Sequence, residues 1–259
     1  MADRRWDIRY YGPSGREWRM SSHDWNAGLK AGGFSGLVGQ LSVSAVRSIG
    51  EPGQRVESYQ VPPADGYLDV FARADGGLTA TDAWVALRQD FKRRAPFGTL
   101  VVGSPLGLAS ARVRLSGELP PPDVDDVMAA EKPLRVPLSN DDGVWWLEAQ
   151  SFPDTVTVTN FGDVTVWPEI VWNGAGGVVK LPSGASFNLP AVKNKHLISL
   201  HPKRTRKVLD AAGVFDDDVY KQLRGVILPE GVATGGSGVF TVPTGAELRW
   251  KVGVLDPWL

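Results

Sequence analysis

Short runs in which apolar and polar residues alternate recur along most of the chain. Alternation at every second position predicts strands that bury one face and expose the other. These runs cover residues 6–10, 17–20, 40–46, 66–71, 99–102, 111–116 and 134–138 in the first half, and 154–159, 165–172 and 247–254 in the second. Turns such as Pro13-Ser14-Gly15 separate them, so we expect hairpins within a mainly β protein.

One segment has the helical period instead. Between Thr79 and Arg94 the apolar residues recur at steps of three and four, and they are Ala80, Ala83, Trp84, Leu87 and Phe91. Thr79 or Thr81 can cap the N-terminus, and Pro96 follows the last turn. The pattern therefore predicts a helix that buries one stripe.

Three further features limit the architecture. Short helices are predicted from Lys203 to Ala212 and from Asp217 to Leu223, each ending before a glycine. Pro137 lacks an N–H for a sheet ladder, so we expect strand 134–138 at an edge. The β pattern restarts near residue 148 without a long linker, which predicts two domains, 1–147 and 148–259.

Composition narrows the class of protein. The 259 residues carry 28 basic and 29 acidic side chains, a net charge of -1, and no cysteine. The charge balance argues against a nucleic-acid reader, and the lack of cysteine excludes disulfide scaffolds, zinc fingers and thiol nucleophiles. No apolar run reaches the length of a membrane span, and the residues after Met1 do not read as a secretory signal.

No catalytic constellation emerges from the motifs. Gly235-Gly236-Ser237-Gly238 lacks the glycine spacing of a nucleophile elbow, and Gly174-Ala175-Gly176-Gly177 lacks that of a phosphate loop. His196 and His201 lie five apart, which does not suit a metal site on one helix. We therefore expect no catalytic residue, no cofactor, no metal and no enzymatic activity, although two distant carboxylates could still meet in space.

Surplus aromatic and basic side chains point to assembly instead. Trp145 and Trp146 are adjacent, so in a strand they face opposite sides, and one of them is a candidate for a domain junction or a subunit interface. Trp258 near the C-terminus is a further interface candidate. The basic cluster Lys203, Arg204, Arg206 and Lys207 reads either as a solvated face or as a contact for an acidic partner.

Several stretches also carry a resemblance to a known family. They are Asp82-Ala83-Trp84-Val85-Ala86-Leu87 with Phe97-Gly98-Thr99-Leu100-Val101-Val102 and Ala111-Arg112-Val113-Arg114-Leu115, then 136–146, 158–170 and 242–252. In order and spacing they resemble a helix leading into two strands, an acidic turn with an aromatic pair, and the opening and closing strands of a second domain. This arrangement resembles the distal tail protein (minor tail protein) family of siphophages, particularly those infecting actinobacteria.

The resemblance implies an N-terminal β-sandwich or split-barrel domain with one helix, which forms a hexameric ring, and a peripheral C-terminal galectin-like β-sandwich. The ring would join the tail tube to the tail-tip hub or baseplate at the distal end of the virion tail, and DNA would pass through its channel unread. Receptor-binding proteins would dock on the outside, with the cluster from Lys203 to Lys207 as the candidate contact. Sequence-specific nucleic-acid binding and membrane insertion are not expected.

A carbohydrate-binding adhesin that recognises host cell-wall glycan is the alternative. A galectin-like sandwich could stack a sugar ring on an exposed tryptophan. The animal-galectin motifs His-x-Asn-x-Arg and Trp-Gly-x-Glu are absent from the sequence, which disfavours this alternative. A glycan-binding screen separates the two hypotheses.

Overall fold

The computed structural model describes residues 6–21, 26–47, 49–50, 52–75, 77–91, 97–122, 130–203 and 207–259. The chain divides into two compact units. Unit 1 comprises Met1–Trp146 with Val254–Leu259, and unit 2 comprises Leu147–Gly253. The expected domains, 1–147 and 148–259, stay a prediction, and in the structure the last six residues return to unit 1. They do so because β20 (Gly253–Val254) pairs with β10 (Trp145–Leu147) and Leu255 accepts a hydrogen bond from Gly39.

Strands dominate unit 1, and the mainly β class is confirmed. Among the described residues, one sheet has the order β2-β1-β7-β8-β9-β6-β3, and β10 and β20 extend it beside β8. Its strands are β1 (Asp7–Tyr11), β2 (Glu17–Arg19), β3 (Ala27–Gly36), β6 (Ala64–Arg73), β7 (Gly98–Ser104), β8 (Gly107–Leu115) and β9 (Glu131–Asn140). A separate hairpin consists of β4 (Ser42–Val46) and β5 (Arg55–Gln60).

The predicted first helix is confirmed as α1 (Ala80–Gln89). Thr79 and Asp82 form a capping box, in which each side chain bonds to the backbone of the other residue. The apolar stripe packs against β6, β9 and β3, and Ala83 and Leu87 are completely buried. Trp84 also donates its indole N–H to the carbonyl of Pro133.

A buried polar cluster fixes the end of α1 to the first two strands. Asp90, the C-cap, accepts the indole N–H of Trp18 at 2.6 Å on its side chain. Its carbonyl accepts the hydroxyl of Tyr10 at 2.9 Å, and burial raises the pKa of that hydroxyl. Because each buried donor has an acceptor, the helix keeps a fixed position in the unit 1 core.

The prediction that strand 134–138 lies at a sheet edge is wrong, because these residues belong to β9, an inner strand. It lies between β6 and β8, and its register with β6 runs from Arg73↔Glu131 to Ala64↔Asn140. The carbonyl of Pro137 bonds Ser116, so Pro137 directs its missing N–H away from β6. Proline is tolerated here because β8 pairs with β9 only near Leu138 and Ser139.

Unit 2 is a β-sandwich with a short helix. Among its described residues, the first sheet has the order β11-β19-β13-β16-β17, and the second has the order β12-β18-β14-β15. The first contains β11 (Gln150–Pro153), β13 (Glu169–Gly174), β16 (Val192–Ser199), β17 (Val208–Asp210) and β19 (Ala246–Trp250). The second contains β12 (Thr155–Thr159), β14 (Gly177–Lys180), β15 (Ser186–Leu189) and β18 (Ser237–Thr241).

Alternation in these strands builds the core as expected. Leu248 and Trp250 of β19 are buried beside Ile170 and Trp172 of β13, whereas Glu247 is exposed. The predicted second short helix is confirmed as α2 (Asp217–Leu223), capped by Asp216. No helix in the described residues is long and apolar enough to cross a membrane.

Candidate assembly interface

The two adjacent tryptophans have different surroundings. Trp145 is completely buried, and its indole N–H donates to the carbonyl of Leu37 at 2.7 Å. Trp146 is half-buried, and its carbonyl accepts the hydroxyl of Ser110 at 3.1 Å. Of this pair, only Trp146 offers side-chain surface to a second molecule.

Trp258 packs within unit 1. Its ring meets Phe34 edge-on at 4.8 Å and Trp6 edge-on at 5.6 Å between centroids. Phe34 lies 6.5 Å from Trp145, so the aromatic rings form a continuous cluster. The cluster anchors the C-terminal residues to unit 1 and leaves Trp6, 43% exposed, at its outer end.

Of the basic cluster, Lys203 and Lys207 lie in the described part of the chain, and Lys207 directly precedes β17. Lys203 and Lys207 are exposed, whereas Arg204 and Arg206 lie outside the described residues. The predicted helix from Lys203 to Ala212 is wrong for its second half, because β17 pairs with β16 in the register His196↔Asp210. Asp210 then accepts the N–H groups of Ala212 and Val214 in a turn that replaces a helical turn.

His196 and His201 have separate partners. His196 is buried, and its Nε2 lies 2.9 Å from Asp216 Oδ2 while its Nδ1 lies 2.9 Å from the carbonyl of Asn194. His201 stacks edge-on against Trp167 at 5.1 Å. Asp216 also accepts the N–H of Val219 at the start of α2. That bond and the contact with His196 hold the pKa of the Asp216 carboxyl below its usual range.

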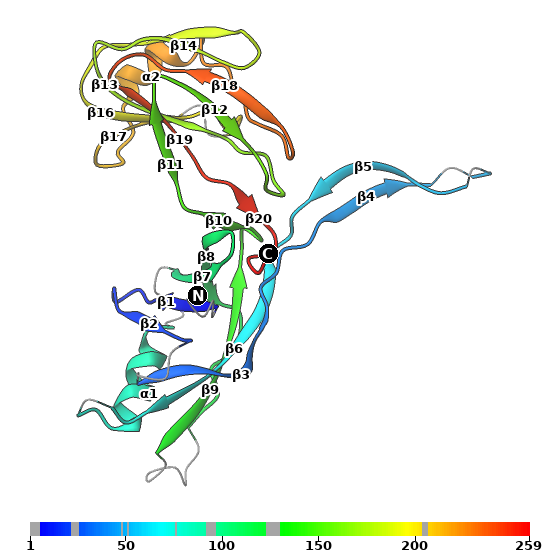
Figure 1. The fold of residues 1–259 in the computed structure, drawn as a ribbon, viewed down its shortest axis with the longest axis vertical. Helices are drawn as coiled ribbons and strands as arrows, with labels where there is room; N and C mark the ends of the chain where they lie inside the picture. The colour runs from blue at the N-terminus through cyan, green and yellow to red at the C-terminus, as the bar shows by residue number, and fades with distance from the viewer. Residues whose placement is uncertain are drawn as a thin grey trace. The chain divides into compact units, whose positions relative to one another are not determined.

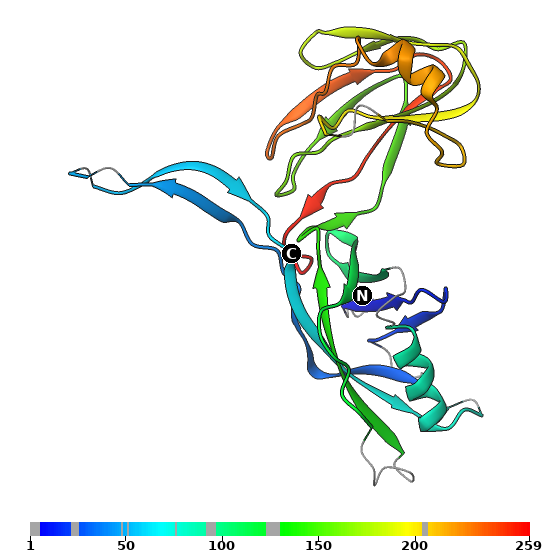
Figure 2. The ribbon, with the colours of Figure 1, turned by 180° about the vertical axis from the view of Figure 1, so that it is seen from behind.

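The hairpin of β4 and β5 is the most exposed ordered element of unit 1, and we name it the arm. Figures 1 and 2 show it as a long ribbon that extends away from the sheet of unit 1. No residue of either strand is buried. The alternation in residues 40–46 predicts a half-buried strand, and this prediction is wrong because no described segment of the chain covers the arm.

Register separates the arm into an apolar and a polar face. Val43 lies opposite Tyr59 and Ala45 opposite Val56 on one face, with Tyr59 64% exposed. On the other face Ser42 lies opposite Gln60 and Ser44 opposite Ser58. A two-stranded ribbon with an uncovered apolar face is marginal in water, and burial against another surface would stabilise it.

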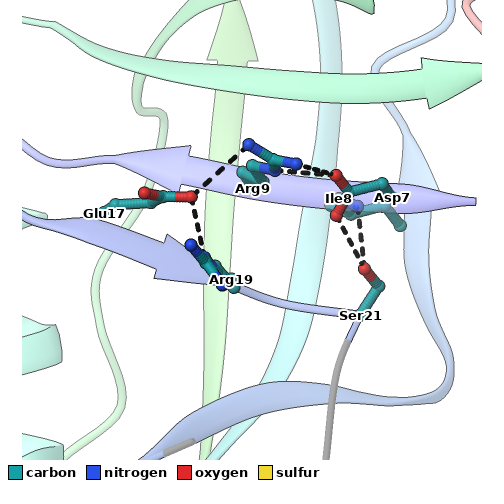
Figure 3. Close-up of polar contacts among 6 residues, drawn as sticks. All are labelled: Asp7, Ile8, Arg9, Glu17, Arg19 and Ser21. Atoms are coloured by element: carbon teal, nitrogen blue, oxygen red, sulfur yellow. Dashed lines mark hydrogen bonds and ion pairs between the residues drawn. The ribbon is translucent and has the colours of Figure 1, made fainter.

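The free edge of the sheet in unit 1 is protected by charge. Figure 3 shows Arg9 of β1 between Asp7 and Glu17, and Arg19 of β2 against the same Glu17 oxygen that Arg9 faces. Glu17 lies 3.6 Å from Arg9 and 3.1 Å from Arg19. The Asp7 carboxylate also raises the pKa of the Arg9 guanidinium. Charged side chains on an edge strand hinder pairing with another strand.

Cross-strand ion pairs line the outer surface of β6, β8 and β9. Arg135 binds Asp69 through two nitrogens, at 2.6 and 2.7 Å, and Arg114 binds Asp141 in the same way, at 2.7 Å through each nitrogen. Each guanidinium lowers the pKa of its carboxyl partner. The charges neutralise one another, so this surface suits a protein contact better than a phosphate site.

Comparison with known proteins finds the fold among phage tail components. No protein-family model and no curated protein matches the chain. A solved structure titled "Crystal Structure of SPP1 Dit (gp 19.1) Protein, a Paradigm of Hub Adsorption Apparatus in Gram-positive Infecting Phages" matches with a TM-score of 0.61 at 11% identity, covering 96% of this chain and 99% of that one.

Two structures of the phage P2 baseplate in its activated conformation, with Ca and with Sr, match with TM-scores of 0.56 and 0.55 at 8% and 9% identity. Each match covers 98% of this chain and 100% of the other. The chain therefore has the fold of the Dit and baseplate hub proteins over nearly its whole length, and the expected resemblance is confirmed at the level of the fold.

Proposed function

We propose that this protein is a structural component of a phage tail tip, in which unit 1 assembles into a hexameric ring between the tail tube and the hub or baseplate. The similarity to Dit and baseplate structures over nearly the full chain supports the tail-tip role. One observation carries the ring: the arm exposes an apolar face that no described segment of its own chain covers.

The arm suits a contact that repeats from copy to copy. Its apolar face, Val43, Ala45, Val56 and Tyr59, would lie on a different surface of the next copy. Such a contact joins two unlike patches, so it is heterologous, and it closes into a ring when the rotation between copies divides a full turn. Burial of the arm in the ring would also supply the stabilisation that the isolated ribbon lacks.

The remaining roles follow from that position. A ring at the distal end of the tail leaves a central channel through which DNA would leave the virion, and the net charge of -1 avoids tight binding to phosphates. Unit 2 would lie at the periphery, where Lys203 and Lys207 are exposed candidates for docking of receptor-binding proteins. The tail tube protein and a hub protein would contact the two ends of the ring.

Negative-stain electron microscopy with light-scattering mass tests the proposal. We expect six-fold rings with an open centre and a mass of six times 28.0 kDa. The double variant Val43→Lys/Tyr59→Lys places charges at directly opposite positions of the apolar face and should abolish the rings.

Ser44→Lys/Ser58→Lys is the matched control, since it places the same charges at opposite positions of the polar face of the same ribbon. We expect this control to keep the rings, and both variants to keep the wild-type circular dichroism spectrum, because no residue of the arm strands is buried within the chain itself. Rings that survive Val43→Lys/Tyr59→Lys would exclude the arm as the contact, and a wild-type protein that stays monomeric at high concentration would contradict self-assembly.

A further inference from the structure

β12 lies at the open edge of the second sheet of unit 2 and carries the sequence Thr155-Val156-Thr157-Val158-Thr159. Figure 1 shows it next to β18, its only strand neighbour in the described sheet. The threonines are exposed, whereas Val156 and Val158 point toward the sandwich core. The strand contains no charge, no proline and no glycine, and its residue types favour β structure.

The hydrogen bonds at both ends of β12 define which residues face the open edge. Asp154 accepts the N–H of Val242, and Asn160 donates its N–H to Gly236. In an antiparallel pair the bonded residues alternate, so Val156 and Val158 make the bonds to β18 between these ends. The N–H and C=O groups of Thr155, Thr157 and Thr159 therefore point away from the sheet.

Several other edge strands of the described chain carry features that hinder further pairing. β2 contains Glu17 and Arg19, and β11 contains Pro153. β15 has only four residues and is followed by Pro190, and β17 ends on Asp210. Charges, prolines and short length are the usual protection of a sheet edge, and the five residues of β12 contain neither a charge nor a proline, although Asp154 directly precedes them.

We propose that the open edge of β12 is an interaction surface that pairs, strand against strand, with β12 of a second copy of this chain. The two strands run antiparallel, with Thr157 opposite Thr157 of the second copy on a two-fold axis. Thr155 then lies opposite Thr159 of the second copy, and Thr159 opposite Thr155. Each of these pairs exchanges two backbone hydrogen bonds, because every threonine directs its N–H and C=O to that edge.

The chemistry of the edge selects a second copy as the partner. The pattern Thr-Val-Thr-Val-Thr reads the same in both directions, so an antiparallel copy matches it residue for residue. Pairing brings no like charges together, and it places threonines opposite threonines, a favourable cross-strand combination. A two-fold contact cannot repeat around a symmetric cyclic ring, so this contact joins copies from different rings and goes beyond the proposed function.

Cysteine cross-linking tests the register directly, because the chain has no cysteine of its own. Thr157→Cys should form a disulfide-linked dimer, since bonded antiparallel partners have Cα atoms about 5.5 Å apart, within disulfide range. Val239→Cys is the matched control, because Val239 is exposed on the same face one strand inward, opposite Thr157. Its two copies would lie about 14 Å apart, so we expect about tenfold less dimer.

The flanking positions distinguish a specific register from random collision. Thr155→Cys and Thr159→Cys should not cross-link alone, because the two copies of each position lie about 14 Å apart along the strands. A mixture of the two variants should cross-link. Equal dimer from Thr157→Cys and Val239→Cys would overturn the proposal, as would self-cross-linking of Thr155→Cys. The measurements are made both with and without Val43→Lys/Tyr59→Lys, so a failed ring and a failed β12 contact give different results.

Charged substitutions of Thr157, which lies on the two-fold axis, provide a second and reversible measurement. It is made in the Val43→Lys/Tyr59→Lys variant, which should form no rings. Thr157→Lys places two ammonium groups opposite each other, and light scattering should then report monomers at concentrations where Val239→Lys remains dimeric. Mixing Thr157→Lys with Thr157→Glu should restore the dimer, because unlike charges now face each other. A mixture that stays monomeric would count against the two-fold register.

Discussion

Trp145 donates its indole N–H to the backbone carbonyl of Leu37, at 2.7 Å and across 108 positions of the sequence. Both residues are completely buried in unit 1, and Leu37 adopts a positive φ of 59°. Leu37 in turn donates its N–H to the carbonyl of Asp65, and it precedes the arm in the chain. The contact therefore fixes the backbone at the point where β3 ends and the chain leads to the arm.

Trp145→Phe should destabilise unit 1 more than Trp146→Phe. The first change removes the donor to the buried Leu37 carbonyl, which costs about 1–3 kcal/mol, and leaves a cavity in addition. The second affects a half-buried side chain that makes no such bond in the described structure. Urea unfolding of both variants measures the difference. Equal losses of unfolding free energy would mean that the bond to Leu37 does not stabilise the fold.

Gly36→Ala should be strongly destabilising. Gly36 has a φ of 71°, and a Cβ there would lie 2.4 Å from the carbonyl oxygen of Asp65 on the neighbouring strand. We expect a loss of more than about 2 kcal/mol, because left-handed strain and a backbone clash add together. Gly15→Ala is the control, with a φ of 85° and open space around the Cβ position, and should lose about 1 kcal/mol. Thermal or urea unfolding distinguishes the two.

Stability in acid should depend on Asp216. The N–H of Val219 and the side chain of His196 lower the pKa of this carboxyl below the ordinary value of 3.8. A lowered pKa in the folded state means that the carboxylate stabilises the fold above the unfolded pKa, and that this stabilisation is lost as pH falls through the folded pKa. Wild-type protein should thus lose unfolding free energy between about pH 5 and pH 2.

Asp216→Asn should flatten that pH dependence. Asparagine keeps an oxygen that can cap α2 but has no charge to lose. Asp218→Asn in the same helix serves as control for removing a carboxylate there, because the Asp218 side chain is 94% exposed. Urea unfolding at a series of pH values measures both. A wild-type slope retained in Asp216→Asn would show that other carboxyls cause the acid sensitivity.

Local patterns in the sequence were sufficient to predict the structure of a segment wherever that structure depends on its near neighbours. The three- and four-residue spacing after Thr79 predicts α1, and the capping box with Asp82 lies within one turn. The helix at 217–223 begins directly after its cap, Asp216. The alternation of Leu248 and Trp250 likewise predicts which face of β19 is buried. Each of these signals acts over a few residues, so the sequence alone carries it.

Tertiary structure decided what covers each face and each edge. Alternation around Val43 resembles that around Leu68, yet the first strand is exposed and the second is buried in a sheet. Alternation at every second residue indicates that one face of a strand is apolar. Only distant segments of the chain, or another molecule, determine whether that face is covered. Pro137 lies in an inner strand because its missing N–H points away from β6, toward Ser116 where the pairing with β8 ends, and this depends on the register with β6. The open edge of β12 likewise emerges only from the sheet order, since residues 154–159 read as one more strand in the sequence.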